Sequence, residues 1–293
     1  MFDKLKLGSI LCLSLILFAC SDPQAQADAA AESVLEPAET ATSRVVALSS
    51  LTADLTQQLA PSKLVGIPGS DIFQEDERFA DLSKVSVGRT PPNLEKIVAL
   101  EPDLVLGAVG FHDEVAKRLE EIGITTLLVD VNSWESLTQI TEDLATRLSA
   151  DASPLLERYQ SCLEQAPPEG GSILVLVSRQ PILAPNQKSW AGDFLQQFNA
   201  ENLAAELQGE SPIGGYVTLS AEKVLQEDPE TILIVDPANS GMLEQFQQDA
   251  FWGQLTASGY GRVYPVDYYG FVNPGSLEKI EEACNSLSDI LAY

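Results

Sequence analysis

A helix-and-strand phrase occurs twice in this chain, 127 residues apart, and it constrains the fold more than any other feature. One copy covers residues 93–106 and the other covers residues 219–233. A Glu-Lys pair opens each copy, at Glu95 and at Glu222, and a proline lies seven residues after each glutamate. A short helix, a proline that ends it and an apolar strand form one αβ unit. Two copies indicate two similar lobes, although short αβ units also resemble one another by chance.

The first nineteen residues have the layout of a secretory signal. Lys4 and Lys6 precede an apolar run over residues 10–19 that is too short to span a bilayer, and Cys20 follows. The four residues that end at Cys20 resemble the lipobox of bacterial lipoproteins, whose cysteine becomes the acylated first residue of the mature protein. We therefore expect a lipoprotein signal peptide over residues 1–19. The alternative is an ordinary cleaved signal with an incidental cysteine.

Residues 20–43 are rich in Ala, Glu, Asp, Gln and Pro, and their only large apolar residues are Val34 and Leu35. Such a segment cannot bury enough apolar surface to offset the entropy lost on ordering. We expect a lipid-anchored, disordered tether over residues 20–43. The folded body then begins at Arg44.

The chain is strongly acidic, with a formal charge of −26 at pH 7. Removal of residues 1–19 takes away two lysines and one aspartate, so the mature protein carries −27. A field of this sign disfavours nucleic acid as a partner and broad adsorption to anionic lipid. We expect a monomer that meets the membrane through its lipid anchor only.

Four cysteines are present, and two of them remain in the folded body. Cys12 leaves with the signal and Cys20 is the proposed lipidation site, which leaves Cys162 and Cys284. An exported protein can join two such cysteines in a disulfide. Two separate buried thiols are the alternative, because the spacing carries no metal-site signature.

Short apolar runs alternate with helical patterns from Arg44 to the C-terminus, which predicts parallel sheets flanked by helices. The predicted strands cover residues 45–48, 64–66, 104–107, 125–129, 173–177, 232–235 and 263–266. The predicted helices cover residues 52–59, 93–100, 113–122, 134–148, 153–165, 190–198, 220–226 and 276–291. The predicted class is α/β, with two αβ lobes that each contain a central, mostly parallel sheet.

Residues 132–150 have the pattern of a long helix that joins an N-terminal lobe over 44–131 to a C-terminal lobe over 151–293. Asn132 and Glu135 form a predicted capping box. Apolar residues then recur on one helix face, at Leu137, Ile140, Leu144 and Leu148. Sixteen residues of helix span about 24 Å, which is enough to connect two lobes. An ordinary surface helix of a single domain is the alternative.

Ligands of open parallel sheets bind outside the carboxyl ends of the strands. The loops expected there, and the segments before the two repeated helices, are rich in glycine, aromatic residues and arginine. They supply most of the candidate ligand-binding residues, which are Ser50, Arg89, Phe111, His112, Arg179, Trp190, Tyr216, Tyr268 and Tyr269. Some of these aromatic residues are expected to belong to the core instead.

Five segments, taken in order, resemble the periplasmic binding proteins of ATP-binding-cassette importers for ferric siderophores, haem and vitamin B12. These segments are residues 44–49, 87–95, 101–105 and 261–264, and the closing helix after residues 273–275. The resemblance covers residues 44–293. It implies two αβ lobes joined by one long helix, with the ligand held in the cleft between the lobes.

The resemblance also assigns roles to particular residues. In that family the glutamates matching Glu95 and Glu222 form ion pairs with arginines of the permease, so a permease and its ATPase are the expected partners. The alternative is that both are solvated carboxylates at helix starts. Arg89 matches an arginine that contacts metal-bound oxygens in ferric hydroxamate binding proteins, a role suited to a guanidinium. A loop ion pair is the alternative for Arg89, and a surface salt bridge is the alternative for Arg179.

Zinc and manganese sites of relatives with this fold need several histidine and carboxylate ligands, and His112 is the only histidine, so such a site is disfavoured. We expect no cofactor and no metal bound directly by the protein. His112 or a tyrosine as an axial haem ligand keeps haem or cobalamin binding as an alternative.

No G-x-S-x-G, P-loop or G-x-G-x-x-G motif is present, so we expect that the protein is not an enzyme. The prediction is capture of an iron chelate in the periplasm or at the cell surface; a non-transport lipoprotein is disfavoured by the paired glutamates.

Overall fold

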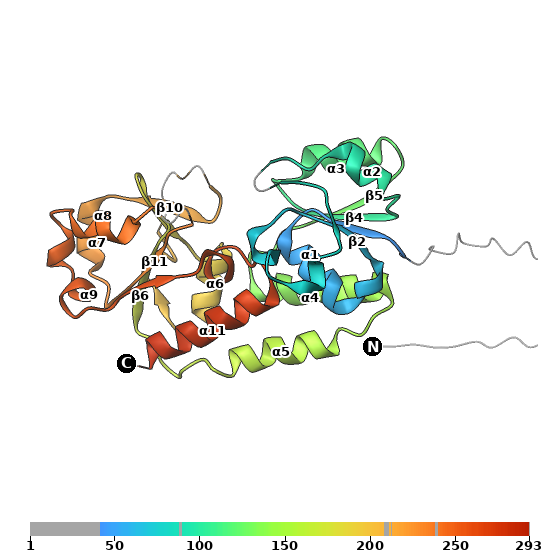
Figure 1. Cartoon of the computed structure of the whole chain (residues 1–293). Coiled ribbons are helices and arrows are strands. Elements are labelled where there is room, and N and C mark those ends of the chain that lie inside the picture. The colour runs from blue at the N-terminus through green and yellow to red at the C-terminus, as the bar shows by residue number, and fades with distance from the viewer. Residues whose placement is uncertain (1–41, 88–89, 208–210, 212, 238–239, 293) are drawn as a thin grey trace, which may run out of the picture. The chain divides into compact units, whose positions relative to one another are not determined.

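The computed structural model describes residues 42–87, 90–207, 211, 213–237 and 240–292 (Figure 1). The predicted signal peptide, the lipidation site Cys20 and nearly all of the tether lie outside these ranges, and so does Arg89. Within the described ranges no helix is long and apolar enough to cross a membrane. The folded body forms two αβ lobes, as the sequence predicts.

The N-terminal lobe is built on a five-stranded parallel sheet in the order β3-β2-β1-β4-β5. Its strands are β1 (Val45–Ala47), β2 (Leu64–Ile67), β3 (Ser83–Lys84), β4 (Leu104–Ala108) and β5 (Thr125–Val129). Helices α1 (Ser50–Leu59), α2 (Leu94–Ala99) and α3 (Asp113–Glu120) connect them, with 3₁₀ turns η1 (Pro61–Lys63), η2 (Asp71–Phe73) and η3 (Glu77–Phe79). The central strand β1 consists of Val-Val-Ala and is fully buried, as expected for a strand covered on both faces.

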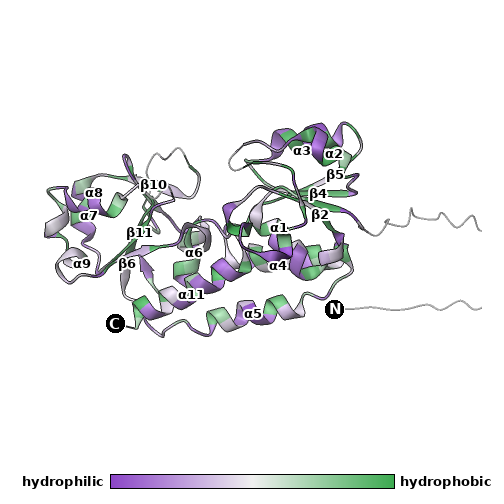
Figure 2. Cartoon of the chain, in the orientation of Figure 1, coloured by the Kyte–Doolittle hydropathy of each residue, from purple (hydrophilic) through white to green (hydrophobic). Residues whose placement is uncertain are grey.

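The C-terminal lobe has a four-stranded parallel sheet in the order β12-β11-β6-β9. These strands are β6 (Ser172–Leu176), β9 (Glu201–Asn202), β11 (Thr231–Val235) and β12 (Val263–Val266). Its helices are α5 (Ser153–Leu163), α6 (Trp190–Gln197), α7 (Ala221–Glu227), α8 (Met242–Gln247), α9 (Thr256–Gly259), α10 (Tyr268–Phe271) and α11 (Leu277–Leu291), with the 3₁₀ turn η4 (Trp252–Gln254). Buried strands such as β11 are largely hydrophobic in Figure 2.

A small antiparallel sheet in the C-terminal lobe was not predicted. It consists of β7 (Ser178–Arg179), β8 (Ile182–Pro185) and β10 (Tyr216–Leu219), in the order β10-β8-β7. The strands β7 and β8 form a hairpin directly after β6. This hairpin therefore projects from the carboxyl end of a central strand.

The two copies of the repeated phrase have the same local structure. Asn93 and Ser220 are the N-caps of α2 and α7, and each accepts the backbone N–H three residues later. Each helix leads to a residue with positive φ, Glu101 (49°) or Asp228 (41°), followed by a buried proline. The strands β4 and β11 then begin at equivalent positions. The repeat is therefore present in three dimensions as well as in the sequence.

The connecting helix is α4 (Trp134–Leu148), and it packs against α1, α5 and α6. Its predicted capping box was wrong by one residue. Ser133 is the N-cap, and its hydroxyl accepts the N–H of Ser136, whose own hydroxyl accepts the N–H of Ser133. This reciprocal pair displaces Asn132 and Glu135 because two serines, spaced as a capping box requires, satisfy both N–H groups.

A disulfide and a buried carboxylate are among the contacts that hold α11 in place. Cys284 of α11 and Cys162 of α5 form a disulfide with a Cα–Cα distance of 5.7 Å. At the start of α11, the Leu277 N–H donates to the buried carboxylate of Asp54 on α1, at 2.8 Å. Burial raises the pKa of Asp54 above its ordinary value. The last helix is thus fastened to the C-terminal lobe by a disulfide and to the N-terminal lobe by a carboxylate.

Candidate ligand site and docking surface

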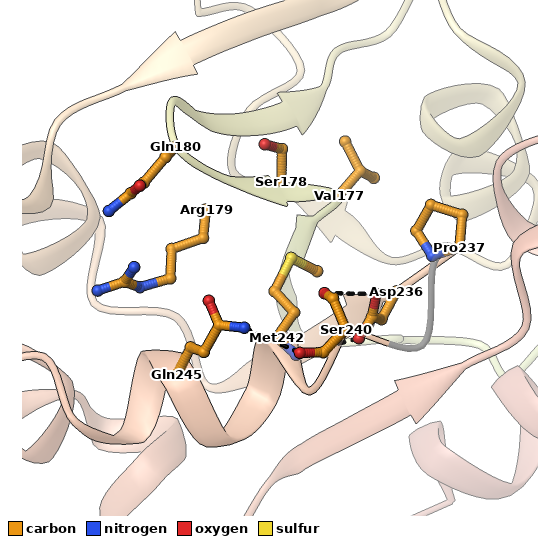
Figure 3. Close-up of a pocket in the computed structure, with 9 residues that line it drawn as sticks. All are labelled: Val177, Ser178, Arg179, Gln180, Asp236, Pro237, Ser240, Met242 and Gln245. Atoms are coloured by element: carbon orange, nitrogen blue, oxygen red, sulfur yellow. Dashed lines mark hydrogen bonds between the residues drawn. The ribbon is translucent and has the colours of Figure 1, made fainter.

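A polar hollow lies at the carboxyl end of the C-terminal sheet. The strands β6 and β11 are parallel neighbours, so the residues that follow them meet at one edge. The hollow has a volume of about 260 Å³, and the β7–β8 hairpin faces α8 across it (Figure 3). We call it the polar hollow; its lining residues are Val177, Ser178, Arg179, Gln180, Asp236, Pro237, Ser240, Met242 and Gln245.

Asp236 directly follows β11 and is held by the start of α8. One of its carboxylate oxygens accepts the Ser240 hydroxyl at 3.0 Å, and the other accepts the Met242 N–H at 3.0 Å. The Gln245 amide donates to the Ser240 carbonyl at 2.9 Å. These bonds fix a carboxylate and an amide at the rim of the hollow.

Arg179, a predicted ligand-binding residue, lines the polar hollow but also forms an ion pair. Its Nε and Nη2 donate to the two carboxylate oxygens of Asp249 at 2.9 and 2.6 Å. Each side chain is 25% exposed. The guanidinium holds the pKa of Asp249 below its ordinary value through these hydrogen bonds. The structure confirms the salt bridge, and the role of Arg179 in ligand binding stays a prediction.

A second hollow, of about 370 Å³, lies next to the first and shares Arg179 and Gln180 with it. Its remaining lining residues are Ile182, Ala221, Asp249, Ala250 and Phe251. Ala221 is the first residue of α7 and directly precedes Glu222. The Arg179–Asp249 pair and the first residue of the helix that carries the second glutamate therefore line the same hollow.

The carboxyl edge of the N-terminal sheet carries Ser50 and Phe111. Ser50 begins α1 just after β1, and its hydroxyl donates to the Ser70 hydroxyl at 3.2 Å. Phe111 follows β4 and is 86% exposed, an unusual state for a phenylalanine. Its neighbour Val109 is 47% exposed. This edge therefore offers apolar surface, whereas the polar hollow offers charge.

His112 lies at the start of α3 and is half-buried. Its Nδ1 accepts the backbone N–H of Ala108 at 2.9 Å. A backbone N–H can only donate, so neutral His112 carries its proton on Nε2. Burial lowers the pKa of His112 below its ordinary value, which favours this neutral form. An Nε2–H group is a hydrogen-bond donor and not a metal ligand, so the geometry disfavours His112 as an axial haem ligand.

Three predicted tyrosines come from two segments. Tyr216 begins β10, and burial raises its pKa to about 12, with a smaller contribution from Tyr268. Tyr268 and Tyr269 begin α10 and pack edge to face with ring centroids 5.2 Å apart. Tyr269 also covers Gly275, where an added Cβ would lie 2.6 Å from the Tyr269 ring. Tyr268 is partly buried and packs against the main core cluster, while Tyr269 packs against its own segment.

Trp190 belongs to the core. It is 3% exposed, its Nε1 donates to the Gly270 carbonyl at 2.8 Å, and its ring stacks on Trp134 with centroids 5.6 Å apart. A side chain with these contacts has no surface left for a ligand. We therefore place Trp190 outside the candidate site.

Glu95 and Glu222 are both exposed in the first turn of a short helix. The lysine beside each glutamate is engaged elsewhere. Lys96 donates to the Lys84 carbonyl at 3.4 Å, and Lys223 forms an ion pair with Glu227. The pKa of Glu222 is held below its ordinary value by hydrogen bonds from its own backbone N–H and from Ser220. Both carboxylates are thus presented to solvent as acceptors at helix starts.

Three residues of this region were missed by the sequence analysis: Asp236, Ser240 and Asp249. Asp236 could have been found, because it directly follows a predicted strand, where the carboxyl-edge rule applies. Asp249 had no such signal, since 70 residues separate it from Arg179. Among the residues that the structure describes, no group of three His, Cys, Asp or Glu side chains is placed to hold a metal ion.

The comparison with protein families decides the identity of the fold. The family described as "Periplasmic binding protein" matches residues 45–268, which is more than half of the chain. The chain belongs to this family. In open α/β sheets, ligands bind outside the carboxyl ends of the strands.

Two relatives and one solved structure show what this chain is similar to. An uncharacterized ABC transporter substrate-binding lipoprotein of Bacillus subtilis is 24% identical, covering 96% of this chain and 95% of the relative. The Fe(3+) dicitrate-binding periplasmic protein of Escherichia coli is 28% identical, covering 62% of each chain. The crystal structure of a periplasmic vitamin B12 binding protein of Vibrio cholerae has a TM-score of 0.65 and 18% identity, covering 86% of this chain and 97% of that one.

Proposed function

We propose that this protein is the substrate-binding component of an ABC importer and that it delivers an iron chelate, most simply a ferric siderophore, to a permease and its ATPase. The observation that carries the proposal is the matched pair Glu95 and Glu222. Each lobe presents one exposed carboxylate at the same position of the same αβ unit. Two carboxylates fixed on two rigid units form a docking surface for two cationic side chains.

The ligand would contact the carboxyl edges of both sheets. On the C-terminal lobe the proposed contacts are Arg179, Tyr216 and Tyr268, and on the N-terminal lobe they are Ser50 and Phe111. Arg89 lies outside the described residues and keeps its proposed contact with chelate oxygens on the strength of the sequence alone. His112 and Tyr269 are weaker candidates. The Ala108 N–H already occupies Nδ1 of His112, and the ring of Tyr269 packs against Gly275.

The proposed location is the outside of a membrane, with the lipid on Cys20 as the anchor. The relative in Bacillus subtilis is a lipoprotein of nearly the same extent. The disulfide between Cys162 and Cys284 supports an oxidising compartment, since such bonds persist in exported proteins and are rare in the cytosol. The proposed organisation is a lobe over 44–131, a connecting helix over 132–150 and a lobe over 151–293.

Two ligand alternatives stay within the same importer role. A vitamin B12 binding protein shares the fold, so a corrinoid is one of them. Haem is the other, although the hydrogen bond from Ala108 to His112 removes one candidate iron ligand. Calorimetric titration of the mature chain, residues 20–293, with a ferric trihydroxamate, ferric dicitrate, haemin and cyanocobalamin separates them. Saturable binding of one iron chelate supports the proposal, and preference for haemin or cyanocobalamin replaces the ligand but keeps the transport role.

The docking role is tested with the double variant E95K/E222K. We expect normal ligand affinity and loss of the ligand-dependent stimulation of the cognate permease–ATPase complex in proteoliposomes. The matched control is E114K/E157K, which reverses one exposed charge on a helix of each lobe away from the repeated phrase. Normal stimulation by the E95K/E222K protein would refute the docking assignment.

A further inference from the structure

The charged side chains that line the polar hollow and its neighbour are few. Among the described residues, Arg179 is the one cation that lines either hollow; Asp236 lines the polar hollow and Asp249 lines the second hollow. All other described lining residues are neutral.

The positive charge of Arg179 is already compensated before any ligand arrives. Asp249 accepts from both Nε and Nη2 in a bidentate arrangement, the strongest geometry for this pair. Two of the five N–H groups of the guanidinium are used, so three remain as donors. Arg179 can therefore give hydrogen bonds to neutral carbonyl or hydroxamate oxygens without offering a net positive field.

Asp249 is held in place by the core and not by the arginine alone. Its N–H donates to the Phe246 carbonyl at 2.9 Å, and its own carbonyl accepts the Trp252 N–H at 3.0 Å. Phe246 and Trp252 are buried and stack with centroids 5.3 Å apart. An anionic ligand would have to compete with a carboxylate whose backbone is fixed on both sides.

We propose that the polar hollow selects uncharged or cationic chelates over polyanionic ones, and that Asp249 is the residue that sets this preference by neutralising Arg179. The inference rests on the proposed function and names the chemical class of its ligand. It favours ferric trihydroxamates, whose oxygen donors cancel the iron charge, and it disfavours polycarboxylate chelates. The overall charge of −26 acts in the same direction. In this respect the chain departs from its relative that binds Fe(3+) dicitrate.

The test compares affinities for a cationic and an anionic chelate in the mature chain and in D249N. The probes are the ferric complex of desferrioxamine B, which carries a positive charge, and ferric dicitrate. We expect the unmodified protein to prefer the desferrioxamine complex. D249N leaves Arg179 uncompensated, so the affinity for ferric dicitrate should rise about five- to tenfold at low salt, while that for the desferrioxamine complex should not rise. The gain should shrink in 0.5 M NaCl because exposed charges are then screened.

Two further variants keep the test decisive. D76N removes a carboxylate charge from a second bidentate pair, Asp76 with Arg78, on the other lobe. It should leave the ratio of the affinities for ferric dicitrate and the desferrioxamine complex unchanged. R179Q/D249N removes both charges of the Arg179–Asp249 pair and should abolish the gain for ferric dicitrate. If D249N does not fold, as judged by its circular dichroism, the ratio of the two affinities in the unmodified protein decides, and equal or tighter binding of ferric dicitrate refutes the proposal.

The outcomes separate this inference from the proposed function. Equal or tighter binding of ferric dicitrate by the unmodified protein, or an unchanged ratio in D249N, overturns the selectivity and leaves the transport role standing. Binding of neither chelate, nor of haemin or cyanocobalamin, overturns the proposed function and this inference together. A rise in ferric dicitrate affinity in both D249N and D76N would assign the effect to overall charge and refute the role of Asp249.

Discussion

The two copies of the repeated phrase fold alike up to the ends of their strands and diverge directly afterwards. Before the strands, both have an N-cap, an exposed glutamate, a left-handed residue and a buried proline. After β4 comes an apolar edge with the exposed Phe111, whereas after β11 comes Asp236 and the polar hollow. The two units therefore repeat the chemistry at the starts of their helices and differ in the residues that follow their strands.

Substitution of the buried residues of α2 and α7 should have the largest effect on stability. Ile97 and Val224 occupy equivalent positions of α2 and α7, and both are 0% exposed. I97A should lower the free energy of unfolding by about 3 kcal/mol and V224A by about 2 kcal/mol, in proportion to the carbon atoms removed. Urea unfolding followed by circular dichroism measures both. V98A, on the exposed side of α2, is the control and should cost less than about 0.5 kcal/mol. If V224A had the same free energy of unfolding as the unmodified protein, the two units would not be equivalent.

The equivalence of the two glutamates is tested by reversing them singly. E95K and E222K should each weaken stimulation of the permease–ATPase complex about tenfold, because each removes one ion pair and introduces one repulsion. The measurement is the protein concentration that gives half-maximal ATPase activity. Stimulation that depends on one glutamate only would show that the lobes dock unequally despite their common structure.

Glycine substitutions at the two residues with positive φ before the prolines should change stability in opposite directions. Glu101 and Asp228 both have positive φ, which costs about 1 kcal/mol for a residue with a Cβ. E101G should therefore stabilise the protein by about 0.5 kcal/mol after the entropic cost of glycine is subtracted. D228G should destabilise it by about 1 kcal/mol, because the Asp228 carboxylate accepts the N–H and hydroxyl of Thr256 at 2.8 and 2.7 Å. Thermal unfolding of both variants checks the sign, and stabilisation by D228G would contradict it.

The smallest expected effect is a dependence of the free energy of unfolding on pH, which arises from Asp228. Hydrogen bonds from Thr256 hold the pKa of Asp228 below its ordinary value. A depressed carboxyl pKa stabilises the folded state above the pKa of the unfolded chain, and this stabilisation is lost as the pH falls through the folded value. The unfolding free energies of the unmodified protein and D228N should therefore converge between about pH 5 and pH 2. A difference that stays constant over this range would rule out the linkage.

The sequence predicted the parallel framework well because its strands are apolar and its helices periodic. The strands over residues 125–129 and 263–266 and the helix over residues 134–148 have the predicted bounds. The antiparallel sheet of β7, β8 and β10 was missed because its strands have two to four residues and lack a clear alternation. Short strands are defined by their partners, which the sequence does not reveal.

The candidate site was predictable only in its location. The carboxyl-edge rule placed Arg179 correctly at a hollow, but its partner Asp249 is positioned by the packing of α8 and η4. Trp190 was assigned to the ligand wall, yet it completes an aromatic stack with Trp134 and Phe194. A long-range ion pair and a stack between helices arise from tertiary contacts, and no local pattern encodes them.

The burial of the tryptophans determines what intrinsic fluorescence reports. The chain has three tryptophans, Trp134, Trp190 and Trp252, and they are 6%, 3% and 4% exposed. Collisional quenchers such as iodide should barely reach these indoles, and a bound chelate should dim them through energy transfer to its own absorption band. Colourless chelates would then bind without an optical signal. Trp252, three residues from Asp249, is the indole best placed to shift its emission when that charge is removed.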